Sequence, residues 1–103
     1  MDIEDIRRKV GAGRYAISFT HTEKLRLRRI KAADIEQAVK SGNIIEDYPN
    51  DPRGASCLIL GHIGNRPLHI LFAQLEAVEL LVVTAYEPDP GEWEDDWQTR
   101  KAR

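Results

Sequence analysis

Four apolar runs, each bounded by turn residues, follow one another in the second half of the chain. Their length and their β-branched and aromatic content predict four consecutive strands, over Ile44 to Tyr48, Cys57 to Ile63, Leu68 to Gln74 and Val78 to Tyr86. The segments between them carry turn signals: a Pro49–Gly54 loop, a Gly64–Pro67 turn and a tight turn near Glu76. Because the last run is nearly all apolar, we expect it near the centre of the sheet.

The first half of the chain has mainly helical patterns. Apolar residues at spacings of three and four predict a helix over residues 2–10, and residues 14–20 alternate as a strand, with Tyr15, Ile17 and Phe19 on one face. A further helix is expected from a cap at Thr20 or Thr22 through Arg29, and another over residues 32–40. In the tail, Trp93 and Trp97 lie four apart, which predicts an amphipathic helix over residues 90–103.

This order predicts an α+β fold, with N-terminal helices packed on a mainly antiparallel sheet of four to five strands and a short C-terminal helix. The length of 103 residues fits a single domain, with an acidic tail at about residues 87–103. No apolar run approaches the ~18 residues of a membrane span, and the acidic start does not resemble a secretory signal. We therefore expect a cytoplasmic protein with no membrane partner.

The single cysteine excludes an internal disulfide and a cysteine-rich zinc site within the chain. Cys57 lies in an apolar run, so a buried, inert thiol is the simpler interpretation and a nucleophile the alternative. We expect no cofactor and no metal. The sequence contains no zinc-ligand spacing, glycine-rich phosphate loop or Gly-x-Ser-x-Gly elbow.

The net charge of −2 conceals an asymmetry, because residues 1–42 carry +4 and residues 43–103 carry −6. Five bases and no acid lie in residues 24–31, namely Lys24, Arg26, Arg28, Arg29 and Lys31. Six acids and no base lie in residues 87–96. Such a split suggests a basic face able to meet phosphate.

Helical periodicity places His21, Lys24 and Arg28 on one face of the basic segment. Leu27 and Ile30 lie roughly opposite and are expected to dock on the sheet, while Arg26 and Arg29 flank the basic row. The segment is therefore either the solvated face of a surface helix or a phosphate-binding face with a histidine that titrates near neutral pH.

RNA cleavage requires a base for the 2′-hydroxyl, cations for the developing phosphate charge and a donor for the leaving oxygen. Further candidates are His69 in the third strand and the hydroxyls of Thr84 and Tyr86, which point the same way in the fourth. Each has a structural alternative, since a strand histidine is often a core residue and the hydroxyls can cap a sheet edge. His62, close to a turn, is a weaker candidate.

The stretches IIEDYPNDPRGASCLILGHIGNRPLHILFA and LLVVTAYEPDPGEWEDDW resemble the bacterial domain-of-unknown-function 4258 family. Its members show a basic helix begun by histidine, then Ile-Glu-x-Tyr-Pro, an Arg-Pro-Leu-His strand and Thr-x-Tyr-x-Pro before a tryptophan. The likeness covers residues 15 to about 100. The chain departs at Leu25, where many members have an arginine.

That family resembles toxins of type II toxin–antitoxin pairs, of the RelE, BrnT and MqsR kind. The resemblance implies a RelE-like fold and a metal-independent endoribonuclease acting on RNA, including ribosome-bound mRNA, with an MqsA-like zinc-finger antitoxin as partner. It further implies that His21, Arg28, His69 and Tyr86 are catalytic and that Lys24, Arg26, Arg29 and Thr84 bind substrate. A non-catalytic RNA- or protein-binding module using the same basic face is the alternative.

Overall fold

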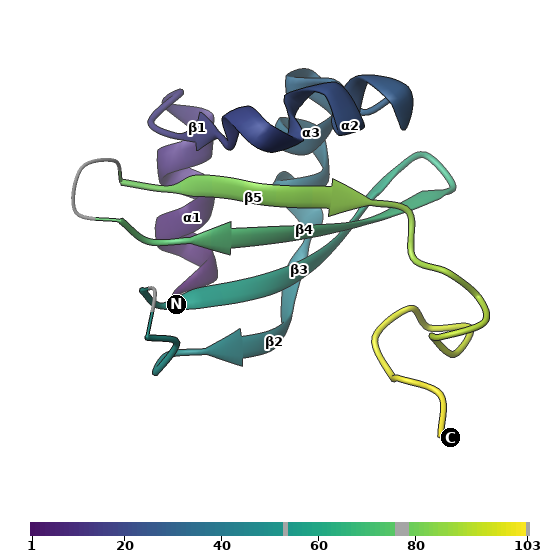
Figure 1. Ribbon diagram of the computed structural model, residues 1–103. Helices are drawn as coiled ribbons and strands as arrows, with labels where there is room; N and C mark the ends of the chain where they lie inside the picture. Colours follow the sequence, from purple (N-terminus) through teal and green to yellow (C-terminus); the bar gives the residue numbers. More distant parts are fainter. Residues whose placement is uncertain (53, 76–78, 103) are drawn as a thin grey trace.

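A five-stranded mixed sheet forms the centre of the molecule in the computed structural model, which describes residues 1–52, 54–75 and 79–102 (Figure 1). The spatial order is β1-β5-β4-β3-β2; β1 pairs with β5 in parallel, and the other neighbours are antiparallel. The strands are β1 (Ala16–Ile17), β2 (Asn43–Tyr48), β3 (Ser56–Ile63), β4 (Arg66–Ala73) and β5 (Leu81–Tyr86). The predicted α+β class and the mainly antiparallel sheet are confirmed.

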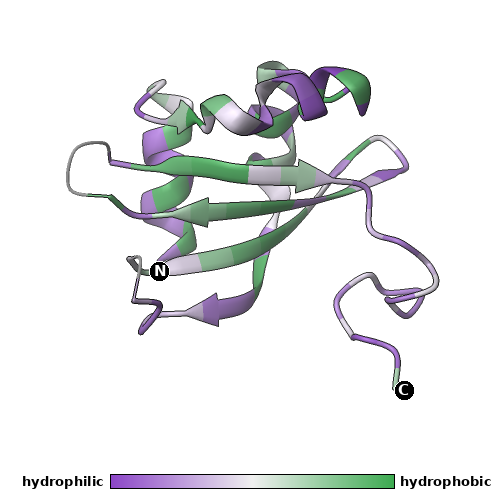
Figure 2. Cartoon of the chain, viewed as in Figure 1, coloured by the Kyte–Doolittle hydropathy of each residue, from purple (hydrophilic) through white to green (hydrophobic). Residues whose placement is uncertain are grey.

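Helices cover one face of this sheet, as expected. They are α1 (Ile3–Gly11), α2 (Thr22–Leu27) and α3 (Ala32–Ser41), with a 3-10 turn, η1 (Phe19–His21), before α2. Figure 1 shows α1 and α3 behind the sheet and α2 above the edge of β5. The strands are mostly apolar, whereas the C-terminal tail is mostly hydrophilic (Figure 2). None of the described helices has the length and apolar character needed to cross a membrane.

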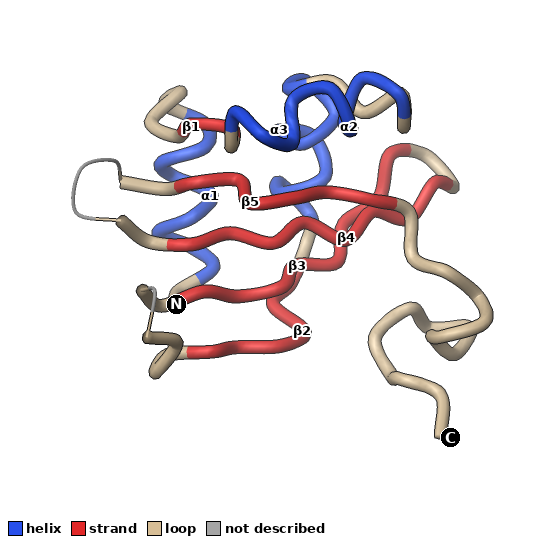
Figure 3. Tube along the Cα trace, viewed as in Figure 1, coloured by secondary structure: helices blue, strands red, loops and turns tan. Residues whose placement is uncertain are grey.

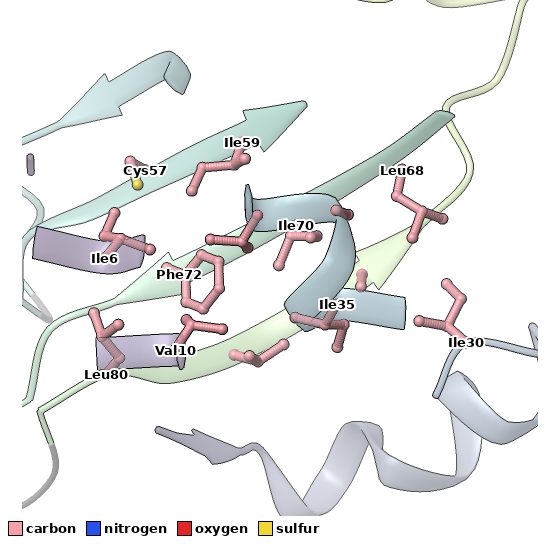
Figure 4. Packing of buried hydrophobic residues seen from close by; sticks show 14 of the residues in the cluster. Ile6, Val10, Ile30, Ile35, Cys57, Ile59, Leu68, Ile70, Phe72 and Leu80 are labelled. Atoms are coloured by element: carbon pink, nitrogen blue, oxygen red, sulfur yellow. The ribbon is translucent and has the colours of Figure 1, made fainter. Parts of the chain in front are cut away.

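The core lies between α1, α3 and the covered face of the sheet. Ile6 and Val10 of α1 and Ile35 of α3 meet Ile70 and Phe72 of β4 (Figure 4). The hydrophobic effect of these buried aliphatic residues is the main force holding helices to sheet. Cys57 is also fully buried there, and burial raises the pKa of its thiol to about 11, which supports the inert interpretation.

The backbones of α3 and β3 approach each other closely at Gly61. A Cβ atom added at this position would lie 2.3 Å from the backbone oxygen of Ala38 in α3. A real Cβ cannot occupy that space, so glycine allows α3 to pack directly on the sheet.

The segment before α2 differs from its prediction. The expected strand over residues 14–20 is reduced to β1, because the chain turns at Ser18 into the 3-10 turn, and the Thr22 hydroxyl donates to the Ser18 carbonyl. Phe19, expected on the same strand face as Tyr15 and Ile17, lies in the 3-10 turn and is 94% exposed. Neither threonine caps α2 through its side chain: the N-cap is His21, without a side-chain hydrogen bond. The helix is also shorter than predicted, because it ends at Leu27 rather than Arg29.

The predicted docking of Leu27 is wrong, since its side chain is 69% exposed. Ile30 is buried, as expected, and Leu25 is buried in place of Leu27. The reason is the turn that ends α2, which reverses the chain after Arg28 and brings Ile30 back against Leu25.

The predicted C-terminal helix is also wrong for the described residues 90–102, which form turns (Figure 3). The carboxylate of Asp89 accepts from the backbone of Gly91, and that of Asp96 accepts from the backbones of Gln98 and Thr99. Such side-chain bonds compete with helix formation. Trp97 has a left-handed φ of 59°, which no helix accommodates.

The last strand lies near the centre of the sheet, as expected, because β5 pairs with the middle strand, β4, on one side and with β1 on the other. The expected start of that strand at Val78 and the turn near Glu76 lie outside the described residues.

Candidate functional site

The guanidinium of Arg28 reaches the edge of β5. Its Nη1 donates to the Thr84 hydroxyl at 3.2 Å and to the Ala85 carbonyl at 2.9 Å. The two-residue strand β1 pairs only with Leu81 and Val82, so β5 continues past the end of β1 toward Thr84 and Tyr86. The structure thus brings Arg28 of the basic segment against Thr84 of β5, which lies 56 residues further along the chain.

Arg66 at the start of β4 holds the end of α2 in place. Its guanidinium donates to the carbonyls of Arg28 at 2.7 Å and Arg29 at 2.9 Å, and its Nε donates to Glu87. Helix C-termini leave carbonyls without intrahelical partners, and a cation there also complements the helix dipole. Sequence reasoning missed this role, although Arg66 belongs to the Arg-Pro-Leu-His pattern.

Arg29 adopts a left-handed conformation, with φ of 57°. The Ile30 amide donates to the Leu25 carbonyl at 2.9 Å and the Arg29 amide to the Arg26 carbonyl at 3.1 Å, which is a Schellman motif with Arg29 at the glycine-favoured position. Such a residue is strained, at roughly 1–2 kcal/mol.

His69 lies on the face of the sheet that also bears Thr84 and Tyr86, directly opposite Tyr86 on β5. The two rings meet edge-on with centroids 5.4 Å apart, and the ring of Trp93 meets His69 at 4.4 Å. The imidazole is completely buried, and its Nε2 lies 2.7 Å from the carbonyl oxygen of Trp97. A carbonyl can only accept, so Nε2 carries the proton and Nδ1 is bare.

The C-terminal tail therefore covers His69. The guanidinium of Arg100 lies 4.6 Å from the Trp93 ring centre and forms an ion pair with Glu46 of β2. Trp93 is buried. Of the acids in the tail, Asp89 and Asp96 bond to their own backbone, and Glu87 pairs with Arg66.

The buried imidazole predicts a pH dependence of stability. Burial, and to a lesser degree the charge of Arg100, lowers the pKa of His69 in the folded protein, whereas the unfolded chain has the ordinary value of ~6.5. The unfolded chain then binds more protons below pH ~6.5, so this contribution is complete above that pH and is lost on acidification. In urea unfolding, we expect His69→Gln to lose stability less steeply than wild type between pH 7.5 and 5.5. The exposed His62→Gln variant is the control, and equal slopes in all three proteins would contradict the prediction.

His21 stands apart from the other predicted residues. It is half-buried between η1 and α2, and its buried Nδ1 has no hydrogen-bond partner among the described residues. Within the same part of the chain, we find no hydrogen bond or ring contact that joins it to Arg28, Thr84 or Tyr86. His62 is exposed near the β3–β4 turn.

The remaining candidates divide between the two sides of α2. Lys24 is exposed on the helical face of His21 and Arg28, whereas Arg26 pairs with Glu23 and lies beside Arg29. Burial raises the pKa of the half-buried Tyr86, opposed mainly by the charge of Arg100, so the hydroxyl stays protonated and can donate a hydrogen bond at neutral pH. Among the residues that the structure describes, no group of three His, Cys, Asp or Glu could hold a metal ion.

The comparison with protein families is decisive for classification. The model of the family described as Domain of unknown function (DUF4258) matches residues 21–87, more than half of the chain. This chain belongs to the DUF4258 family. The matched part of this DUF4258 protein runs from His21 through β5 to Glu87, and so contains Arg28, Arg66 and His69. No curated protein and no solved structure matches the chain.

Proposed function

We propose that this DUF4258 protein is a metal-independent endoribonuclease with a RelE-like fold, the toxin of a type II toxin–antitoxin pair. The observation that carries the proposal is the contact of Arg28 with Thr84 on the strand that also bears Tyr86. A guanidinium fixed beside the Thr84 hydroxyl, in the basic segment that also carries Lys24, is suited to hold a phosphodiester. The basic segment supplies the sequence-independent attraction for RNA.

In the proposed reaction, His21 accepts the proton of a ribose 2′-hydroxyl. The 2′-oxygen then bonds to the adjacent phosphorus, and the bond from phosphorus to the 5′-oxygen breaks. A water molecule protonates the leaving oxygen, and the hydroxide that remains takes the proton from His21. Arg28 and Lys24 stabilise the added charge on the phosphate oxygens, and Tyr86 donates a hydrogen bond to one of them. All of these groups are side chains of the protein, so the reaction uses no metal.

His69 has a different role in this scheme from the other predicted catalytic residues, His21, Arg28 and Tyr86. Because it is buried beneath Trp93, it reaches no substrate in the conformation described, and we assign it the role of orienting the Tyr86 ring. Direct acid catalysis by His69 requires the tail to leave the sheet.

A second candidate function is a non-catalytic module that binds RNA or protein through the same basic face. The burial of His69 favours it, since a site with one accessible histidine lacks the paired acid and base of an efficient nuclease.

The two functions are separated by incubating the purified protein with mRNA in EDTA, with and without ribosomes. The nuclease proposal expects cleavage that His21→Ala reduces about 100-fold, because general base catalysis contributes ~10²–10⁴. His62→Ala, which removes an exposed histidine, is the control. RNA retention without products would assign the module instead, and cleavage unaffected by His21→Ala would remove the proposed base.

The antitoxin part of the proposal rests on family likeness and charge. A partner able to silence this face would carry acids, and we propose a zinc-finger protein of the MqsA-like kind, encoded beside the toxin. Coexpression with the product of the adjacent reading frame should relieve toxicity in growing cells, and toxicity unchanged by that product would reject the pairing.

A further inference from the structure

An open groove lies on the opposite flank of α2 from the candidate site, bounded by β1 and the start of α3. Its volume is about 630 Å³, within the range of ligand sites in proteins, roughly 300–1,000 Å³. The residues that line it are Ile17, Thr22, Leu25, Arg26, Arg29, Ile30, Lys31 and Ala32. The groove is independent of the Arg28 contact, because that side chain extends to β5.

The floor and the rim of this groove differ in character. The floor is aliphatic, formed by Leu25 and Ile30, which are each 4% exposed, and by the half-buried Ile17. The rim carries the exposed cations Arg26, Arg29 and Lys31.

Nearby carboxylates offset only part of the rim charge. Glu23 pairs with Arg26, and the carboxylate of Asp34 accepts from the backbone amide of Lys31. The side chain of Arg29 has no ion pair or hydrogen bond within the described residues. The groove therefore combines an apolar floor with unbalanced positive charge.

The backbone of Arg29 at the rim of the groove is also unusual. Glycine fits the left-handed end of a Schellman motif without strain, yet the chain has an arginine there, with φ of 57°. Strain of this kind is found where the surroundings or a function requires the residue. Here the strained backbone holds a cation at the rim.

We propose that this groove binds an acidic amphipathic helix of a partner protein, separate from any RNA. The aliphatic floor would receive apolar side chains spaced three and four apart, as in helix-in-groove recognition, and carboxylates beside them would pair with Arg29 and Lys31. The lining contains no aromatic ring, which is the surface that unpaired bases stack on, so the groove suits a peptide better than RNA.

The test uses two synthetic 18-residue helical peptides, with leucines at positions i, i+4 and i+7 flanked by glutamates in one and by lysines in the other. We expect saturable binding of the glutamate peptide alone in fluorescence anisotropy, with NMR shifts at the methyl groups of Ile17, Leu25 and Ile30. Arg29→Gly should weaken this binding about fivefold, the value of one exposed ion pair. Arg29→Lys should retain most of it.

Arg29→Gly is a sharp variant because unfolding cannot explain its loss of binding. Removing the left-handed strain should raise its Tm by about 4–8 °C, and Arg8→Ala, an exposed arginine on α1, is the charge-matched control. Equal binding of both peptides, no effect of Arg29→Gly, or methyl shifts caused by a single-stranded oligoribonucleotide instead of the peptide would each overturn the proposal. So would self-association abolished by Arg29→Gly, which would assign the groove to a second copy. None of these outcomes depends on whether the protein cleaves RNA.

Discussion

Gly61→Ala should destabilise the protein by about 3 kcal/mol, near the upper end for an overpacked core position. The added Cβ would lie 2.3 Å from the oxygen of Ala38 and 2.8 Å from its Cβ, so α3 or β3 must move. Both contacts involve backbone or the first side-chain atom, and neither can rotate away. Because α3 supplies Ile35 and Val39 to the core, the displacement affects the whole helix–sheet interface. The measurement is urea unfolding followed by circular dichroism.

The matched control is Gly11→Ala, the same chemical change at the end of α1. No atom lies within 4 Å of the added Cβ there, and alanine favours the helix over glycine. We expect this variant to have unchanged stability or to be stabilised by up to about 0.5 kcal/mol. The gain is small because the full advantage of alanine over glycine applies within a helix, and Gly11 is its last residue. A loss of stability in Gly61→Ala no larger than in the control would show that α3 and β3 do not approach as described.

Arg28→Ala should lower kcat/KM for RNA cleavage about 100-fold, comparable to losing one preorganised donor to a developing negative charge. The structure gives the reason, since the guanidinium is held by Thr84 and the Ala85 carbonyl and so needs little reorganisation to meet a phosphate. Fold stability should fall by only about 1 kcal/mol, the net value of a hydrogen bond of this kind. Cleavage kinetics and unfolding of the same preparation therefore separate the two effects.

Arg28→Lys and Arg8→Ala are the controls for this prediction. Lysine preserves the charge without the fork of donors, so it should restore part of the activity. Arg8 is exposed on α1 and should be without effect beyond nonspecific attraction. Equal losses in Arg8→Ala and Arg28→Ala would mean that only overall charge matters, and the proposed site would be rejected.

The periodic elements of the fold could be predicted from the sequence, and the reason is visible in particular residues. Ile3, Ile6 and Val10 predicted α1, which Asp2 caps by accepting from the Glu4 amide at 3.3 Å. The four apolar runs became β2 to β5, because each is separated by turn residues from the next. Alternation predicted that Thr84 and Tyr86 point the same way. That His69 shares their face comes from the register of β4 and β5, in which His69 lies opposite Tyr86.

The segments with competing local bonds were predicted incorrectly. Phe19 leaves the strand pattern, and the tail leaves the helical one, because threonine and aspartate side chains bond to nearby backbone there. Spacing of apolar residues does not register such bonds. The burial of Leu25 in place of Leu27 has a different origin, because the backbone bonds of the chain reversal at Arg29 decide which side of α2 meets the sheet.

The amino-acid sequence alone predicted the α+β class, the basic segment and the set of residues that we propose to bind phosphate. Only the tertiary structure decided that Arg28 meets Thr84, that the tail buries His69 and that Arg29 lines a separate groove. The physical reason is the range of the interactions. Periodicity records which residues must leave water within one helix or strand, whereas contacts between α2, β5 and the tail depend on how those elements pack.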